Sequence, residues 1–132
     1  MLFRSPGKLP LHTLIPALAL RDGEPGLVFG TEGGHGQAQT HVQLLTRMAV
    51  DGLDPQAAIS APRFTIDPGS GLVAVEDHMP GEWIDELERR GHPVLRVPRY
   101  RHGPGIAHAI ERTRHGFRAG SDPRAEGGVM GW

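Results

Sequence analysis

The stretch LVFGTEGGHGQAQTHVQLLTRMAV, residues 27–50, decides the fold that this sequence predicts. Its first three residues form a short apolar run whose length and composition are typical of a buried β-strand. The run breaks at the glycine-rich segment 30–34, and a helical pattern begins near Gln37. Apolar residues at three-and-four spacing predict the buried face of that helix: Val42, Leu45 and Ala49, with Leu44 and Met48 beside them.

A strand that runs through a double glycine into a helix leaves backbone N–H groups at the helix entrance. These groups have no partners within the helix and lie at the positive end of its dipole. Such a place suits a phosphate, a carboxylate or a developing oxyanion. The segment is neither a Walker loop, since it lacks the Lys-Ser/Thr ending, nor a GxGxxG motif. An ordinary tight turn that contains glycine is the alternative interpretation.

Composition and charge exclude several classes of protein. The chain has 132 residues, 38% of them hydrophobic, and a formal net charge of -1. This charge, without a basic stripe, removes the electrostatic case for nucleic-acid binding, and no apolar run approaches the length of a membrane span. The absence of cysteine excludes disulfides and thiolate metal sites. The opening residues MLFRSPGK lack a signal-peptide core, which favours the cytoplasm but leaves the compartment undecided.

The segments around the central stretch predict a hairpin before it and a short helix after it. Residues 14–20 and 27–29 are expected to pair as antiparallel strands because an Asp-Gly turn lies between them. Asp54 and Pro55 supply an N-cap and a first-turn proline for a helix over 56–60.

The second half of the chain predicts one more helix among short strands. The helix over 81–90 is expected to bury Trp83, Ile84 and Leu87. Strands are expected over 64–67, 72–76, 94–97, 106–110 and 117–119. This order of elements favours an α+β fold with a mostly antiparallel sheet over a doubly wound fold.

Other polar residues near the central stretch and the C-terminus are candidates for substrate contacts or metal binding. Gln37 and Gln39 either contact a substrate or cap the helix, and capping is favoured. The segment SDPR, 121–124, is interpreted as a structural turn in which Asp122 caps and Arg124 pairs. The eight histidines do not show the helical spacing of metal ligands, so no metal site is predicted.

Four motifs in order along the chain point to one family: PLHTLIPA at 10–17, FGTEGG at 29–34, AISAPRF at 58–64 and AGSDPRAEGGVMGW at 119–132. Together they resemble the C-terminal part of the small subunit of γ-glutamyltransferases, also called γ-glutamyltranspeptidases. The resemblance implies an α+β fold that is part of the αββα sandwich of N-terminal-nucleophile hydrolases. It also implies that 1–132 is a single domain without the nucleophile-bearing segment, and it implies no metal or organic cofactor.

In this family of glutathione metabolism, an N-terminal Thr freed by self-cleavage attacks a γ-glutamyl amide, and the acyl group passes to water or an amino acid. The resemblance assigns the oxyanion-hole glycines to Gly33 and Gly34. The family's Ser-Ser pair, which contacts the substrate carboxylate, falls on His12 and Thr13, and only Thr13 keeps a hydroxyl. Glu32 stands where many members have proline, and its charge is expected to repel an anionic substrate.

The resemblance implies that the nucleophilic Thr lies upstream of PLHTL, on a segment that this chain lacks. Thr13, Thr31 and Thr40 are internal and have no free amine. The predicted function is therefore to supply the oxyanion hole and carboxylate contacts to a nucleophile carried elsewhere. One alternative is a catalytically inactive module that binds a small carboxylate or serves assembly, and another is a phosphate site at the helix entrance.

The resemblance also implies a partner. In the family the strand that bears the Thr is central to its sheet, so this piece alone is expected to expose an apolar face and an unpaired sheet edge. The chain is therefore predicted to self-associate or to require an upstream or large-subunit segment.

Overall fold

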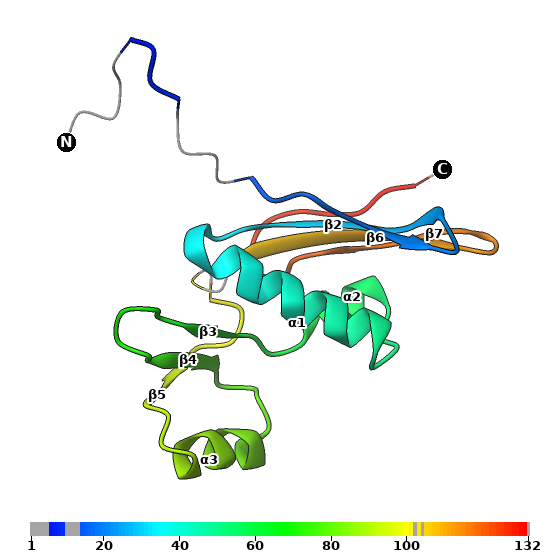
Figure 1. Ribbon diagram of the computed structural model, residues 1–132. Coiled ribbons are helices and arrows are strands. Elements are labelled where there is room, and N and C mark those ends of the chain that lie inside the picture. The colour runs from blue at the N-terminus through cyan, green and yellow to red at the C-terminus, as the bar shows by residue number, and fades with distance from the viewer. Residues whose placement is uncertain (1–5, 10–13, 102, 104, 132) are drawn as a thin grey trace.

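The computed structural model describes residues 6–9, 14–101, 103 and 105–131, and Figure 1 shows two β-sheets with helix α1 between them. His12 and Thr13 lie outside the described residues. The elements follow in the order β1 (Ala17–Arg21), β2 (Glu24–Glu32), the 3-10 helix η1 (Gly34–Gly36), α1 (Gln37–Ala49), α2 (Pro55–Ser60), β3 (Phe64–Ile66), β4 (Val73–Glu76), α3 (Gly81–Arg89), β5 (Val94–Val97), β6 (Ile106–Thr113) and β7 (Gly116–Ser121).

The strands form a larger and a smaller sheet. The larger sheet has the order β1-β2-β6-β7, and all its neighbouring strands are antiparallel. The smaller sheet has the order β3-β4-β5, in which β3 and β4 are antiparallel and β4 and β5 are parallel. This arrangement confirms the predicted α+β class with mostly antiparallel pairing.

Strands β1 and β2 form the predicted hairpin, although their limits differ from the prediction. β1 begins at Ala17 rather than at residue 14. It starts directly after Pro16, which has no N–H to donate to a strand ladder. β2 extends beyond the predicted run 27–29 because its pairing with β6 continues as far as the pair Glu32–Ile106.

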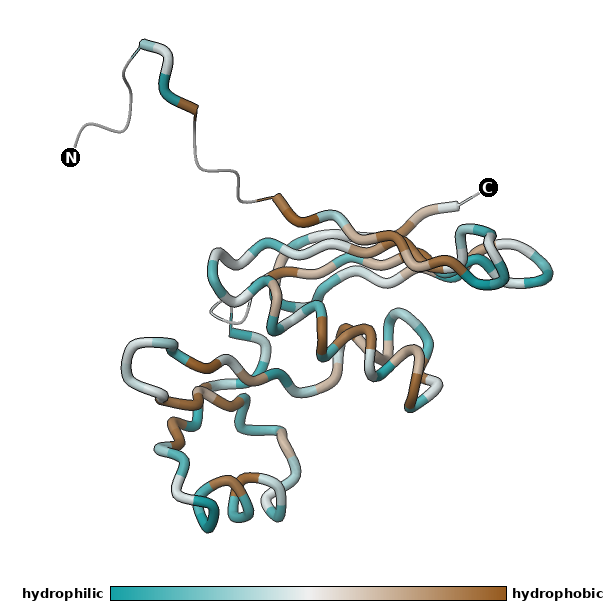
Figure 2. Tube along the Cα trace, viewed as in Figure 1, coloured by the Kyte–Doolittle hydropathy of each residue, from teal (hydrophilic) through white to brown (hydrophobic). Residues whose placement is uncertain are grey.

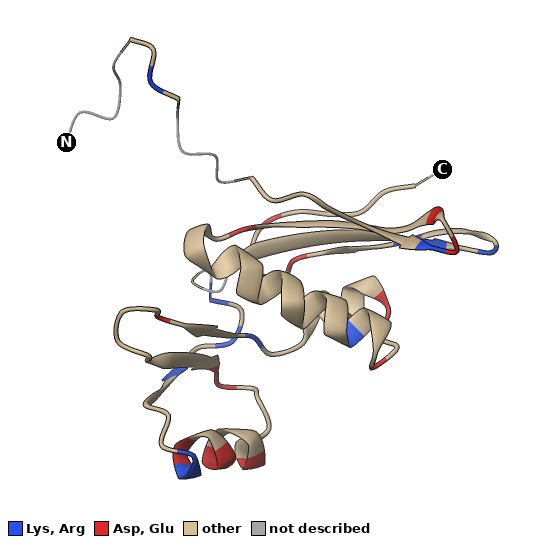
Figure 3. Cartoon of the chain, in the orientation of Figure 1, with Lys and Arg blue, Asp and Glu red and all other residues tan. Residues whose placement is uncertain are grey.

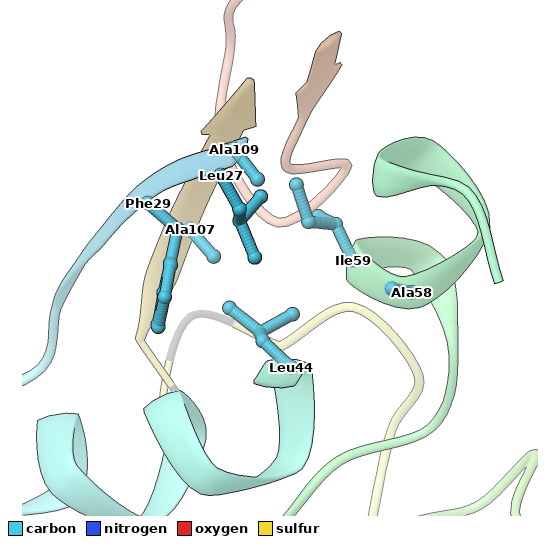
Figure 4. Packing of buried hydrophobic residues seen from close by; sticks show 7 residues of the cluster. All are labelled: Leu27, Phe29, Leu44, Ala58, Ile59, Ala107 and Ala109. Atoms are coloured by element: carbon cyan, nitrogen blue, oxygen red, sulfur yellow. The ribbon is translucent and has the colours of Figure 1, made fainter. Parts of the chain in front are cut away.

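The main hydrophobic core lies between the larger sheet and the helices α1 and α2, as Figure 4 shows. Side chains from β2 and β6 point towards Leu44 of α1 and Ile59 of α2. The side chains of Leu44 and Ile59 are both fully buried. The buried members are Leu27, Phe29, Leu44, Ala58, Ile59, Ala107 and Ala109.

The buried face of α1 is not the one that the apolar spacing predicts. Leu44 is fully buried, but Val42 is 65% exposed and Leu45 is 40% exposed. Polar side chains complete the buried face: Gln37, Thr40 and Gln43. The amide of Gln43 donates to the carbonyl of Phe64 at 2.9 Å and accepts from its N–H at 3.2 Å. The helix therefore binds β3 through hydrogen bonds, which hydrophobic periodicity does not register.

Helix α2 begins as predicted. The side chain of Asp54 accepts a hydrogen bond of 2.8 Å from the backbone N–H of Ala57, and Pro55 occupies the first turn. The cap satisfies one of the N–H groups that a helix start leaves without a partner.

Helix α3 packs on the smaller sheet through a narrower face than predicted. Ile84 is fully buried in a cluster with Val73, Val75 and Met79, and Leu87 is partly buried. The prediction that Trp83 belongs to the core is wrong, because its side chain is 58% exposed. A short helix against a three-stranded sheet buries few residues per turn, and Trp83 lies at the border of that contact.

The face of the larger sheet opposite the helices is apolar and open within the described part of the chain. Leu18 pairs with Val28, and Val28 pairs with Ile110, so these side chains form one row across three strands. They are 57%, 49% and 49% exposed, and Phe117 on β7 is 75% exposed. Figure 2 shows the apolar segments that run along this sheet. We refer to this surface as the open sheet face.

A buried ion network joins the two sheets. It consists of Arg63 before β3, Glu76 at the end of β4, and Asp122 and Arg124 after β7, and none of them is more than 6% exposed. Asp122 accepts from Arg63 Nη2 at 2.7 Å and from Arg124 Nη1 at 3.1 Å. Arg124 also pairs with Glu76, through a hydrogen bond of 2.7 Å from Nε to Oε1. The network fixes the larger sheet relative to the smaller one.

Candidate functional site

The candidate site lies where β2 ends and η1 leads into α1. Gly33 has φ 142° and ψ 23°, and Gly34 has φ 54°. Both values lie in the region that glycine adopts readily and that a β-carbon disfavours. The carbonyl of Gly33 accepts from the N–H of Gly36 at 3.0 Å, which closes the turn. The two glycines therefore allow the chain to reverse between the strand and the helix.

The turn presents backbone amides. Within the described residues, the N–H groups of Gly33 and Gly34 donate no hydrogen bond. A β-carbon at Gly34 would meet no atom within 4 Å, so the space beside it is open. Amides in this position at a helix entrance are suited to meet negative charge.

Charged side chains are scarce in the segment that forms the turn and most of α1. Glu32 is the one Asp, Glu, Lys or Arg between residues 30 and 46, and it is exposed. Figure 3 shows α1 without a charge until Arg47 near its end. No Lys or Arg of this segment therefore lies beside the backbone amides of the turn.

The glutamines at the start of α1 behave differently from the prediction. No side chain caps α1, whose N-cap residue is Gly36. Gln39 instead pairs with the backbone of Ile66, donating to its carbonyl at 2.9 Å and accepting from its N–H at 2.7 Å. Gln37 is buried. The favoured capping role is therefore wrong, because Gln39 binds the edge of β3.

The predicted turn at 121–124 is confirmed as structural. Asp122 accepts from the N–H of Arg124 at 3.0 Å, and Arg124 pairs with carboxylates. The same Asp122 also accepts from the N–H of Ala107 at 2.7 Å. Sequence reasoning missed the partners Arg63 and Glu76. Arg63 lies in the motif AISAPRF, so the family resemblance is the signal that could have pointed to this residue.

Two hollows of the described surface lie beside other parts of helix α1. One of about 290 Å³ lies at the other end of α1, between Leu45, Met48 and strand β1. Another, of about 380 Å³, lies between α1 and α3 and includes Arg47 and Trp83. Neither of these two hollows is lined by Gly33 or Gly34.

The described residues lack two further features. In that part of the chain, no three His, Asp or Glu side chains lie close enough to hold a metal ion. No helix there has the length and apolar character needed to cross a membrane.

Solved structures match this fold closely. The cephalosporin acylase from Bacillus halodurans is 35% identical with a TM-score of 0.86, over 98% of this chain and 24% of that chain. The γ-glutamyltranspeptidase from Pseudomonas nitroreducens complexed with L-DON is 26% identical with a TM-score of 0.81, over 98% of this chain and 67% of that chain. The fold is thus that of part of an N-terminal-nucleophile hydrolase, the αββα sandwich that the resemblance implies.

Sequence comparison defines the family more narrowly. The family model described as Gamma-glutamyltranspeptidase matches residues 2–132. The Glutathione hydrolase-like YwrD proenzyme of Bacillus subtilis is 38% identical over 131 residues, which are 96% of this chain and 25% of that protein. The Oxamate amidohydrolase proenzyme of Klebsiella pneumoniae is 37% identical over 138 residues, 100% of this chain and 26% of that protein. The chain belongs to the γ-glutamyltranspeptidase family, and it spans about a quarter of the length of these two relatives.

Proposed function

We propose that this chain supplies the oxyanion hole for cleavage or transfer of a γ-glutamyl or related acyl amide, by a Thr nucleophile on another segment. Membership of the family supports an acyl-amide hydrolase or transferase role. The observation that carries the finer assignment is the pair of unpartnered amides at Gly33 and Gly34 within the described residues. In this proposal 1–132 acts as one domain, and the ion network that joins its two sheets supports that view.

The proposed chemistry proceeds in two acyl transfers. The Thr hydroxyl adds to the amide carbonyl while the free α-amine of the same Thr accepts the proton. The carbonyl oxygen becomes negative and accepts hydrogen bonds from the N–H groups of Gly33 and Gly34, which stabilises the intermediate. The C–N bond then breaks, the amine leaves with a proton, and water or an amine takes the acyl group from the Thr.

The proposal also concerns the nature of the acyl group. We assign the carboxylate contact of the substrate to His12 and Thr13. The exposed Glu32 beside the turn disfavours a second negative charge close to the reacting carbonyl. The relatives carry names that refer to glutathione, oxamate and cephalosporin. The proposal therefore covers an acyl amide of the γ-glutamyl type and its relatives, rather than glutathione alone.

The open sheet face supports the need for a partner. Exposed apolar side chains in one continuous row are typical of a surface that another chain covers, and β1 and β7 are the outer strands of their sheet. We expect the isolated chain to self-associate in dilute solution unless the upstream segment is supplied, and light scattering measures this. The double variant Val28→Lys/Ile110→Lys should be less associated, and a wild-type monomer at micromolar concentration argues against the expectation.

The function is tested by reconstitution with a γ-glutamyl anilide. The isolated chain should release no aniline, and the chain joined to a family segment that carries the nucleophilic Thr should release it. Binding without turnover in the joined protein would favour the alternative of an inactive carboxylate-binding module. Movement of the Gly33 and Gly34 amides in NMR spectra with inorganic phosphate, but not with a γ-glutamyl amide, would favour the phosphate site.

A further inference from the structure

The glycine turn rests on a residue far from it in sequence. Gly105 precedes β6 and is buried, with φ +84°. A β-carbon on Gly105 would lie 2.1 Å from the carbonyl oxygen of Glu32 and 3.3 Å from the Cα of Gly33. Real β-carbons do not approach backbone this closely. Only a hydrogen fits between residue 105 and the peptide that enters the turn.

The position of Gly105 is itself fixed by the ion network. Arg63 Nη1 donates to the carbonyl of Gly105 at 2.9 Å. The guanidinium of Arg63 is held in turn by Asp122 at 2.7 Å and by the carbonyl of Ile59 at 3.2 Å. Asp122 also accepts from the N–H of Ala107, so the chain is held on both sides of residue 106. Gly105 therefore has little freedom to move away from the Glu32–Gly33 peptide.

We propose that Gly105 is a positioning residue for the oxyanion hole, and that Arg63 holds it there. The contact sets where the Glu32–Gly33 peptide lies, and that peptide carries the N–H of Gly33. The proposal rests on the proposed function of the turn. An added β-carbon would displace this peptide by about 1 Å, and misplacement on that scale costs on the order of 10²-fold in rate. The ion network thus positions the oxyanion hole through the contact between Gly105 and the Glu32–Gly33 peptide.

The experiment compares Gly105→Ala with Gly103→Ala in the protein that carries this chain and its nucleophile. Gly103 is a matched control in the same loop, because a β-carbon there would meet no atom within 4 Å. We expect Gly105→Ala to lower kcat about 10²-fold with KM changed less than about 2-fold, since the lost interaction belongs to the transition state. Gly103→Ala should keep wild-type values. Urea unfolding, measured in parallel, separates this effect from loss of the fold.

A second readout does not depend on turnover. In ¹⁵N-¹H spectra of the protein that carries this chain and its nucleophile, Gly105→Ala should shift the Gly33 amide, while Gly103→Ala leaves it in place. If Gly105→Ala does not fold, Arg63→Lys is used instead. Lysine keeps the positive charge but lacks the second guanidinium nitrogen, so it cannot bind both Asp122 and the carbonyl of Gly105 as Arg63 does. Arg63→Lys should then shift the Gly33 amide and lower kcat.

The outcomes distinguish the two proposals. An unmoved Gly33 amide or a wild-type kcat in a folded Gly105→Ala protein overturns the positioning role. Equal losses in Gly105→Ala and Gly103→Ala also overturn it, because the loss then belongs to the loop in general. A shifted Gly33 amide in a protein whose wild type cleaves no acyl amide supports the contact and refutes the proposed function instead.

Discussion

Replacing Asp122 by alanine is expected to destabilise the chain by about 3–5 kcal/mol, because two buried guanidinium groups lose their shared carboxylate. Burial, followed by the charge of Arg124, lowers the pKa of Arg63 to about 10, so Arg63 stays protonated at neutral pH. The N–H of Ala107 also loses its acceptor at 2.7 Å. Small domains have only about 5–15 kcal/mol of stability in total. Urea unfolding followed by circular dichroism measures the loss.

A matched control is available on the surface. Asp85 has a side chain that is 75% exposed and a distant ion pair of 3.9 Å with Arg96, so Asp85→Ala should leave the unfolding midpoint unchanged. Asp122→Asn should fall between the two, since an amide still accepts hydrogen bonds but carries no charge. A midpoint for Asp122→Ala that equals the wild-type value would show that the network does not stabilise this fold.

The second large effect is on turnover. Gly33→Ala in the protein that carries the nucleophile is expected to lower kcat by about 10²–10³-fold, the usual cost of losing one oxyanion-hole donor. A side chain disfavours φ 142°, so the peptide must rotate and its N–H must turn away from the reacting oxygen. The release of aniline from a γ-glutamyl anilide measures the loss.

Gly30→Ala serves as the control for this variant. Gly30 lies in β2 three positions earlier, its φ is not positive, and a β-carbon there would meet no atom within 4 Å. It should keep wild-type kcat and KM. A Gly33→Ala enzyme with full activity would remove the amide of this residue from the mechanism.

Much of the fold can be predicted from local patterns. The change of apolar spacing from a strand to a helix, with glycines between, predicts β2, the turn and α1 in their observed order, although β2 is longer than predicted. The Asp-Gly turn and the Asp54-Pro55 pair identified the hairpin and the start of α2, because both signals act over a few residues. The buried face of α1 could not be predicted in this way, since Gln43 is buried by hydrogen bonds to β3 rather than by apolar contacts.

The supports of the candidate site could not be predicted from local patterns. Arg63 and Glu76 resemble ordinary surface charges in the sequence, and in the structure they are buried in ion pairs with Asp122 and Arg124. Gly105 resembles one more loop glycine until its contact with Glu32 is seen. Each of these relations joins residues far apart along the chain. The glycine turn itself could be predicted because the pattern that marks it lies within six consecutive residues.

The residues of the ion network are far apart in sequence, which affects the order in which this chain folds during synthesis. Arg63 is made 59 residues before its partner Asp122, and Glu76 is made 48 residues before Arg124. Until the later pair emerges from the ribosome, the earlier charges remain hydrated and the two sheets have no polar junction between them. Contacts of this sequence separation form late and slowly. The polar junction between the two sheets therefore forms only after residue 124 has been synthesised.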